Sequence, residues 1–89
     1  MKSLVVKLTQ AQIKAGQDLV RYLIKKIGIT HIFAHRQSYS QRQNDPGPDI
    51  WHHIGQWAID QRELSDGGPN YKISSGKPIP DIWRYPRGA

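Results

Sequence analysis

The chain contains no cysteine, and its 89 residues include one methionine and one phenylalanine. Without cysteine there can be no disulfides, no thiolate metal site and no cysteine nucleophile. No apolar run approaches the ~20 residues that a membrane-spanning helix needs. The apolar part of Met1–Lys7 is too short for a secretory signal, so a complete chain of this sequence is expected in the cytoplasm, or leaves by another route.

Acidic residues are also few, with 7 Asp and Glu against 13 Lys and Arg, which gives a net charge of +6. A basic balance favours anionic partners such as nucleic acid, anionic lipid or a cell-wall polymer. The positive residues are spread along the chain, and Lys25-Lys26 is the only adjacent pair. Because a nucleic-acid groove needs clustered cations, a nucleic-acid partner is not expected.

The first half of the sequence predicts an α/β domain. Ser3–Leu8 alternates apolar and polar residues, as strands do. Thr9 and Gln12 fit a capping box for a helix that would stop at Gly28. Ile29–Ala34 is rich in β-branched and aromatic residues and predicts a second strand. Strand, helix and strand would form a βαβ unit whose two strands are parallel.

The second half predicts one more helix and an extended arm. Pro48 is well placed as the first residue of a helix that carries aromatic residues through about Gln61. From Ser65 onward Gly and Pro are frequent, which predicts an arm wrapped around the domain. We therefore expect a partial domain over residues 1–64 and an arm over 65–89. The expected anchors of the arm are Ile79, Ile82 and Trp83.

A candidate site follows the second predicted strand. His35 ends its apolar run, and ten residues later comes Asp45-Pro46-Gly47-Pro48. In open α/β sheets, chemistry gathers just beyond the carboxyl ends of strands. Imidazole and carboxylate are common zinc ligands, and a catalytic zinc needs three protein ligands and one open position. This stretch offers two.

This pattern resembles the C-terminal half of zinc-dependent N-acetylmuramoyl-L-alanine amidases, whose fold is shared by the peptidoglycan recognition proteins. The resemblance lies in the Thr9-x-x-Gln12 helix start, the strand Ile29–Ala34 ending in His35-Arg36, and Asp45-Pro46-Gly47-Pro48 at the family's spacing before an aromatic helix. It covers about half of the chain. The arm is also similar to extensions of some bacterial members.

The resemblance implies zinc as cofactor, with His35 as the second zinc histidine and Asp45 as the third ligand. It implies hydrolysis of the amide between the muramyl lactyl group and L-alanine of peptidoglycan or a muropeptide, and hence a location in the cell envelope. The family's first zinc histidine and catalytic glutamate belong to its N-terminal half, and the eight residues before Thr9 hold neither. Many hydrolytic members carry a lysine where this chain has Gln43, so the catalytic residues are unknown. We expect a chain that is incomplete as an isolated catalyst and a second chain that completes the domain.

Other residues offer two interpretations each. His31 shares a strand face with His35, but four extended residues span roughly 13 Å, too far to hold one ion together. Arg36 could bind a substrate carboxylate or be a plain surface residue. Trp51 could stack on a sugar ring or pack in the core, as could Trp57 and Trp83. His52 and His53 are expected to be solvated helix residues, and His31 a half-buried one.

Three classes of function remain open: part of a peptidoglycan amidase, a non-catalytic peptidoglycan-binding or regulatory module, and a small basic module that interacts with nucleic acid. An upstream reading frame that carries the missing N-terminal half would favour the first, and zinc content that falls when His35 is replaced would support the site assignment. Muropeptide binding that a chelator leaves unchanged would favour the second, and steeply salt-dependent binding to nucleic acid would favour the third.

Overall fold

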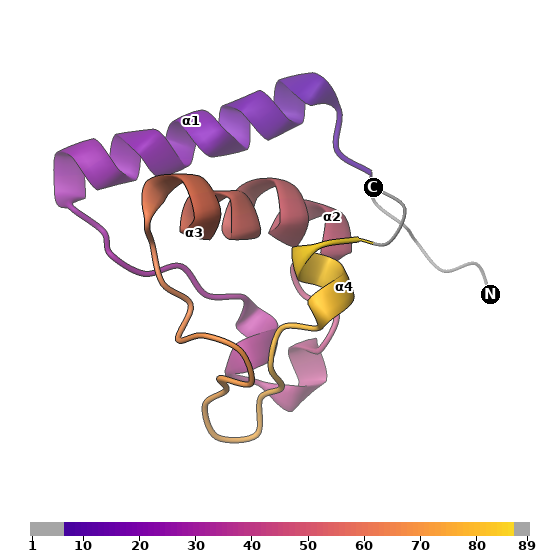
Figure 1. The fold of residues 1–89 in the computed structure, drawn as a ribbon. Coiled ribbons are helices and arrows are strands. Elements are labelled where there is room, and N and C mark those ends of the chain that lie inside the picture. Colours follow the sequence, from indigo (N-terminus) through magenta and orange to yellow (C-terminus); the bar gives the residue numbers. More distant parts are fainter. Residues whose placement is uncertain (1–6, 87–89) are drawn as a thin grey trace.

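The computed structural model describes residues 7–86, and within that range the regular structure is helical (Figure 1). The elements are, in order, α1 (Gln10–Ile27), η1 (His35–Gln37), η2 (Ser40–Arg42), α2 (Pro48–Ile50), η3 (Trp51–Gln56), α3 (Trp57–Arg62) and α4 (Asp81–Arg84). None of the described helices is both long and apolar enough to cross a lipid bilayer.

The predicted βαβ unit is wrong, because residues 7–86 form no sheet. Residues 3–6 of the first predicted strand lie outside the described residues. Leu8 pairs with no strand, since its N–H donates to the carboxylate of Asp49. Residues 29–34 lack helical structure, but their only bridge is an isolated parallel one between His31 and Ser65. Without a continuous neighbour, this segment cannot build the ladder that defines a strand.

Helix α1 begins and ends where the sequence predicts. The Thr9 hydroxyl accepts from the N–H of Gln12, and the Gln12 side chain accepts from the N–H of Thr9, which completes the capping box. At the other end Gly28 adopts a left-handed φ of 76° and donates to Leu23 and Ile24. Glycine suits this position because other residues are strained there.

The predicted second helix is also found, as the unbroken run α2–η3–α3 with Pro48 at its start. Its middle part, η3, has the wider hydrogen bonding of a π-helix, a feature that the sequence did not predict. There the Trp51 ring lies so close to Gly55 that a Cβ on the glycine would come within 2.5 Å of it. The run ends at Glu63, which takes a left-handed φ of 60°.

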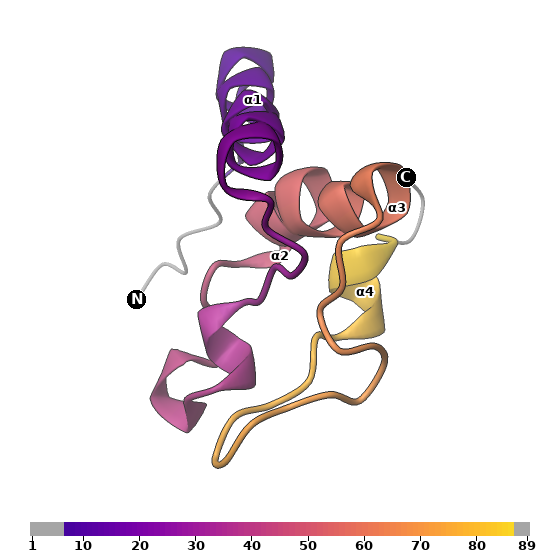
Figure 2. The same cartoon turned by 90° about the vertical axis from the view of Figure 1, so that its left-hand side faces the viewer.

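Two small hydrophobic clusters hold the elements together. Helix α1 crosses over η3 and α3 (Figure 2). At this crossing Val20 of α1 is buried against Ala58 of α3 and Leu64. The second cluster joins the segment before His35 to the helical run and the arm through Ala34, Trp51, Ile79 and Trp83.

The arm is partly as predicted. Ile79 and Trp83 are buried anchors, but Ile82 is wrong as an anchor because it is 53% exposed. The arm also contains the short helix α4, which packs beside the helical run (Figure 1). Its buried ion pair, between Arg84 and Asp66 at 2.7 Å, ties the two ends of the arm together.

Candidate functional site

His35 and Asp45, predicted as ligands from their spacing, converge in the structure. The segment between them folds back through two short 3-10 turns, η1 and η2. The Arg36 N–H donates to the carbonyl of Asp45 at 3.1 Å and closes the loop at the backbone. The Nδ1 atom of His35 then lies 3.4 Å from Oδ2 of Asp45.

The separation of 3.4 Å between His35 and Asp45 is compatible with two ligands of one zinc ion, and the same distance separates His53 from Asp49. It is longer than a well-formed N–H···O hydrogen bond. Two ligand atoms bound to one tetrahedral zinc at ~2.0–2.1 Å stand roughly 3.4 Å apart. Both side chains are also reachable, with 51% of the His35 and 46% of the Asp45 side chain exposed. The pair therefore has the spacing and access that two ligands of one ion require.

The pair does not make a complete ligand set. No group of three His, Cys, Asp or Glu side chains that could hold an ion occurs within residues 7–86. His31 is exposed rather than half-buried; its Nδ1 meets the Thr30 hydroxyl at 2.7 Å, and its ring stacks on Phe33. The donor types fit zinc, but their number falls short of the three that a catalytic site needs.

His52 and His53 are partly buried, not fully solvated as predicted. Nδ1 of His52 lies 2.7 Å from the Arg84 carbonyl, and Nε2 of His53 lies 3.4 Å from Oδ1 of Asp49. Since a carbonyl can only accept, the His52 Nδ1 carries the proton. The His52 ring therefore connects the helical run to α4, whereas the His53 ring contacts Asp49 within the run, and neither belongs to the His35–Asp45 pair.

Arg36 binds the protein itself. Its Nε donates to the Pro78 carbonyl and one terminal nitrogen donates to the Gln43 carbonyl, each at 2.6 Å. Its guanidinium also stands over the Trp83 ring, 5.3 Å from the centroid. Burial lowers the pKa of Arg36 from its ordinary value. These contacts use much of the donor capacity that a substrate carboxylate would need, and they fix the loop that carries the pair.

Trp51 and Gln43 complete the set of predicted site residues. Trp51 is 2% exposed, and its ring nitrogen donates to the side chain of Gln56 at 3.3 Å, so its surface is taken up by the core. The Gln43 side-chain oxygen accepts from Nζ of Lys77 at 3.2 Å. A cation from the arm thus stands at the residue where the resemblance expects a lysine.

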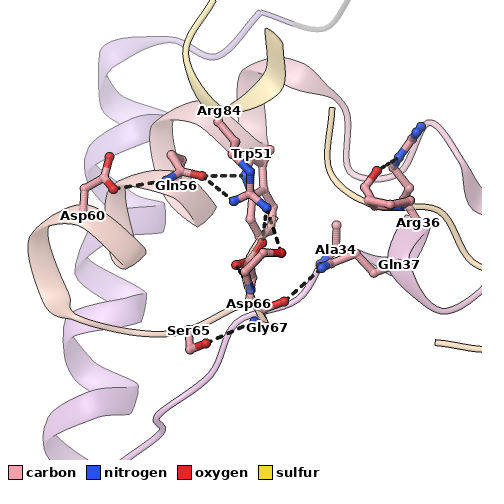
Figure 3. Close-up of polar contacts among 12 residues, drawn as sticks. Ala34, Arg36, Gln37, Trp51, Gln56, Asp60, Ser65, Asp66, Gly67 and Arg84 are labelled. Atoms are coloured by element: carbon pink, nitrogen blue, oxygen red, sulfur yellow. Dashed lines mark hydrogen bonds and ion pairs between the residues drawn. The ribbon is translucent and has the colours of Figure 1, made fainter. Parts of the chain in front are cut away.

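Sequence reasoning missed the contact of Lys77 with Gln43. It also missed the buried amide of Gln37 (Figure 3). The Gln37 side chain, 1% exposed, accepts from the Ala34 N–H at 2.8 Å and donates to the Asp66 carbonyl at 3.1 Å. It therefore ties the residue before His35 to the arm at Asp66. Neither residue had a signal in the sequence, because a lysine in an arm and a glutamine in a polar loop both look solvated.

A second buried network, centred on Arg84, holds the arm to the helical run (Figure 3). Arg84 donates to Asp66 at 2.7 Å and to Gln56 at 2.9 Å. Gln56 in turn donates to Asp60 and to the Tyr85 hydroxyl. This network fixes the arm on the helical run and contributes no side chain to the His35–Asp45 pair.

The residues that border the pair on its open side are polar. A shallow hollow beside it is lined by Gln41, Arg42, Asn44 and Asp45. Arg42 therefore contributes a positive charge to the hollow that Asp45 also lines, where an anionic group could bind. A scan against protein-family models, a search of curated proteins and a search of solved structures each found no match to this chain.

Proposed function

We propose that this chain is related to the peptidoglycan amidases and contributes two ligands, His35 and Asp45, to a zinc site that hydrolyses the N-acetylmuramoyl–L-alanine amide bond. The observation that carries the proposal is the 3.4 Å separation between His35 Nδ1 and Asp45 Oδ2 on an exposed surface. The ligand types and their spacing suit tetrahedral zinc.

The remaining ligand has to come from outside this sequence. Residues 1–6 and 87–89 contain no His, Cys, Asp or Glu, and residues 7–86 bring no third donor to the pair. When bound, zinc would polarise the scissile carbonyl and lower the pKa of its water towards ~7. The chain's own contribution is to hold the imidazole and the carboxylate in place through Arg36 and Gln37.

Lys77 has a proposed part in this site. An amide at position 43 brings no positive charge to a developing oxyanion, but the Lys77 ammonium is bonded to that amide. Electrostatic stabilisation of this kind is often worth on the order of 100-fold in rate for one donor. We therefore assign Lys77 the role of placing charge beside Gln43, as a positioning residue.

Zinc titration of the 89-residue chain tests the proposal. We expect weak binding, because two ligands are present, and a loss of roughly tenfold or more in affinity in both His35→Ala and Asp45→Asn. The matched control is His31→Ala, which removes an exposed imidazole four residues away and should leave zinc affinity unchanged. Equal zinc affinity in the wild-type chain and the His35→Ala variant would contradict the assignment.

A non-catalytic role in peptidoglycan binding is the second candidate, because no third donor joins the His35–Asp45 pair among residues 7–86. This alternative predicts that a purified muropeptide binds with the same affinity before and after treatment with a chelator. The amidase-related role instead predicts that the chelator weakens binding, and that His35→Ala weakens it without a chelator.

A further inference from the structure

The backbone of residues 29–34 is hydrogen-bonded along one edge only. Toward the arm, Ser65 donates to the Thr30 carbonyl at 3.0 Å and its own carbonyl accepts from Ile32 at 2.9 Å. In an extended chain the N–H and C=O of one residue point to the same edge, and alternate residues point to opposite edges. His31 and Phe33 therefore direct their backbone groups away from the arm.

Those outward groups have no partner within residues 7–86. Neither the N–H nor the C=O of His31 or Phe33 takes part in any hydrogen bond there. The side chains along this segment are equally open: Phe33 is 47% exposed, and its ring lies between His31 and Tyr71 at centroid distances of 5.7 and 5.8 Å. An edge of this kind, with unpaired amides beside exposed rings, is a template for an added strand.

The open edge leads directly into His35, where the ligand set is also incomplete. His35 begins the 3-10 turn η1 and its carbonyl accepts from the N–H of Ser38, so the open edge ends at Ala34. A strand that is added along this edge and continues past Phe33 can bring a side chain to an ion held by His35 and Asp45. His31 cannot reach that ion, because it is roughly 13 Å along the same segment. The unpaired backbone edge of residues 29–34 and the incomplete ligand set of His35 and Asp45 are therefore adjacent.

We infer that the outward edge of residues 29–34 is the docking site for a β-strand that carries the third ligand of the His35–Asp45 pair. Since residues 1–6 and 87–89 hold no His, Cys, Asp or Glu, a strand with that ligand comes from outside this sequence. The docking step stands on the hydrogen-bond pattern, whereas the ligand step rests on the proposed function. The incoming strand should alternate apolar and polar residues, so that one face covers Phe33.

The positive charge of this chain indicates which polar residues the added strand should carry. The net charge of the chain is +6, and Lys25 and Lys26 immediately precede the segment at the end of α1. Arg42 lies beyond its other end, beside Asp45. A strand with acidic residues at its polar positions is therefore favoured, and a second copy of this basic chain is disfavoured.

Synthetic peptides that alternate valine and glutamate provide the probe, with a histidine at one end or the other and with alanine in place of that histidine as the control. Each is added to the isotope-labelled 89-residue chain, and amide hydrogen exchange is followed by NMR. We expect exchange at His31 and Phe33 to slow by about tenfold or more at saturation, because amides in a ladder exchange only when it opens. A peptide that alternates valine and lysine should protect them less.

Two variants of Phe33 distinguish the contribution of its backbone N–H to strand binding from the contribution of its ring. Phe33→Pro removes the outward N–H and should abolish binding, whereas Phe33→Ala keeps the N–H and should only weaken binding. Tyr22→Ala removes an exposed ring of α1 and serves as the matched control, with no effect expected. Because proline could disturb the fold, the wild-type exchange experiment decides independently of this variant.

Zinc distinguishes the two parts of the inference. We expect zinc to tighten binding of one histidine peptide about tenfold, to leave the alanine peptide unchanged, and to have no effect in His35→Ala. Protection of His31 and Phe33 without any zinc effect would overturn the ligand assignment and leave the docking edge standing. Peptide binding that leaves these two amides exchanging freely would overturn the docking edge. Self-association of the chain that protects the same amides would overturn the identity of the partner.

Discussion

Helix α1 and the segment that follows it differ in where their backbone hydrogen bonds are made. Helix α1 satisfies its main chain internally and closes both ends with its own caps, Thr9 and Gly28. Residues 29–45 depend on groups far away in the sequence, such as Ser65 and Pro78, and leave the outward backbone of His31 and Phe33 without a partner in residues 7–86. The comparison teaches that local signals build the scaffold, whereas distant contacts build the site.

The largest expected effect comes from breaking the contact that holds the arm. Replacing Arg84 with methionine leaves Asp66 buried without its cation, which should cost about 3–5 kcal/mol of unfolding free energy. Urea denaturation followed by tryptophan fluorescence measures it. Lys72→Met, an exposed cation in the same arm, is the control and should change stability little. Equal stabilities of the two variants would show that the ion pair does not hold the arm.

A smaller but still substantial effect is expected at Gly76. A Cβ at this position would lie 2.0 Å from the carbonyl oxygen of Gln37, and backbone cannot move aside as a side chain can. Gly76→Ala should therefore cost about 1–3 kcal/mol and also weaken zinc binding, because Gln37 is two residues from His35. Gly68→Ala tests the alternative that any glycine of the arm has this effect, since a Cβ there would meet no atom within 4 Å. It should reduce stability through its positive φ but leave zinc binding intact.

A substitution at the cap of helix α1 should lower the unfolding free energy by less and should leave zinc binding unchanged. Thr9→Ala removes the acceptor for the Gln12 N–H and should cost about 1 kcal/mol of unfolding free energy. Zinc affinity should stay at the wild-type value, which titration of the same sample checks. If Thr9→Ala changed zinc affinity as much as Gly76→Ala does, the division between scaffold and site would be wrong.

The smallest effect is a change of stability at alkaline pH. A hydrogen bond to Asp60 raises the pKa of the exposed Tyr85 above its ordinary 10.0. A raised pKa in the folded state means that this contribution is fully present below pH 10 and is lost as the pH rises through the folded value. Urea midpoints should therefore fall slightly between pH 9 and 11 in the wild-type chain, and by less in Tyr85→Phe. Identical slopes in both would remove Tyr85 as the cause.

The helices could be predicted from the sequence because their signals are local. The capping box at Thr9, the glycine stop at Gly28 and Pro48 at the start of the next helix each depend on a few neighbouring residues. The lack of a sheet in residues 7–86 could not be predicted, because apolar alternation shows that a segment can pair but not whether a partner exists. Residues 29–34 have the pattern of a strand and a bridge only at His31.

The candidate site also has features that could be predicted from the sequence and features that could not. The convergence of His35 and Asp45 was predicted from the resemblance, in which both residues are ligands of one ion, and the two side chains do lie close together. Their role as zinc ligands stays a prediction. Lys77 and Gln37 could not be found, since the first contacts a residue 34 positions away and the second one 29 positions away. Nothing in the local sequence encodes such contacts.

The shared amide of Gln37 has a mechanical consequence. One carboxamide holds the residue before His35 and a carbonyl of the arm, so the arm cannot shift without turning the imidazole that follows Ala34. If zinc binds the pair as proposed, its occupancy and the position of the arm at Asp66 are therefore coupled. A molecule that moves the backbone at Asp66 should then change zinc affinity, and bound zinc should in turn restrain that part of the arm.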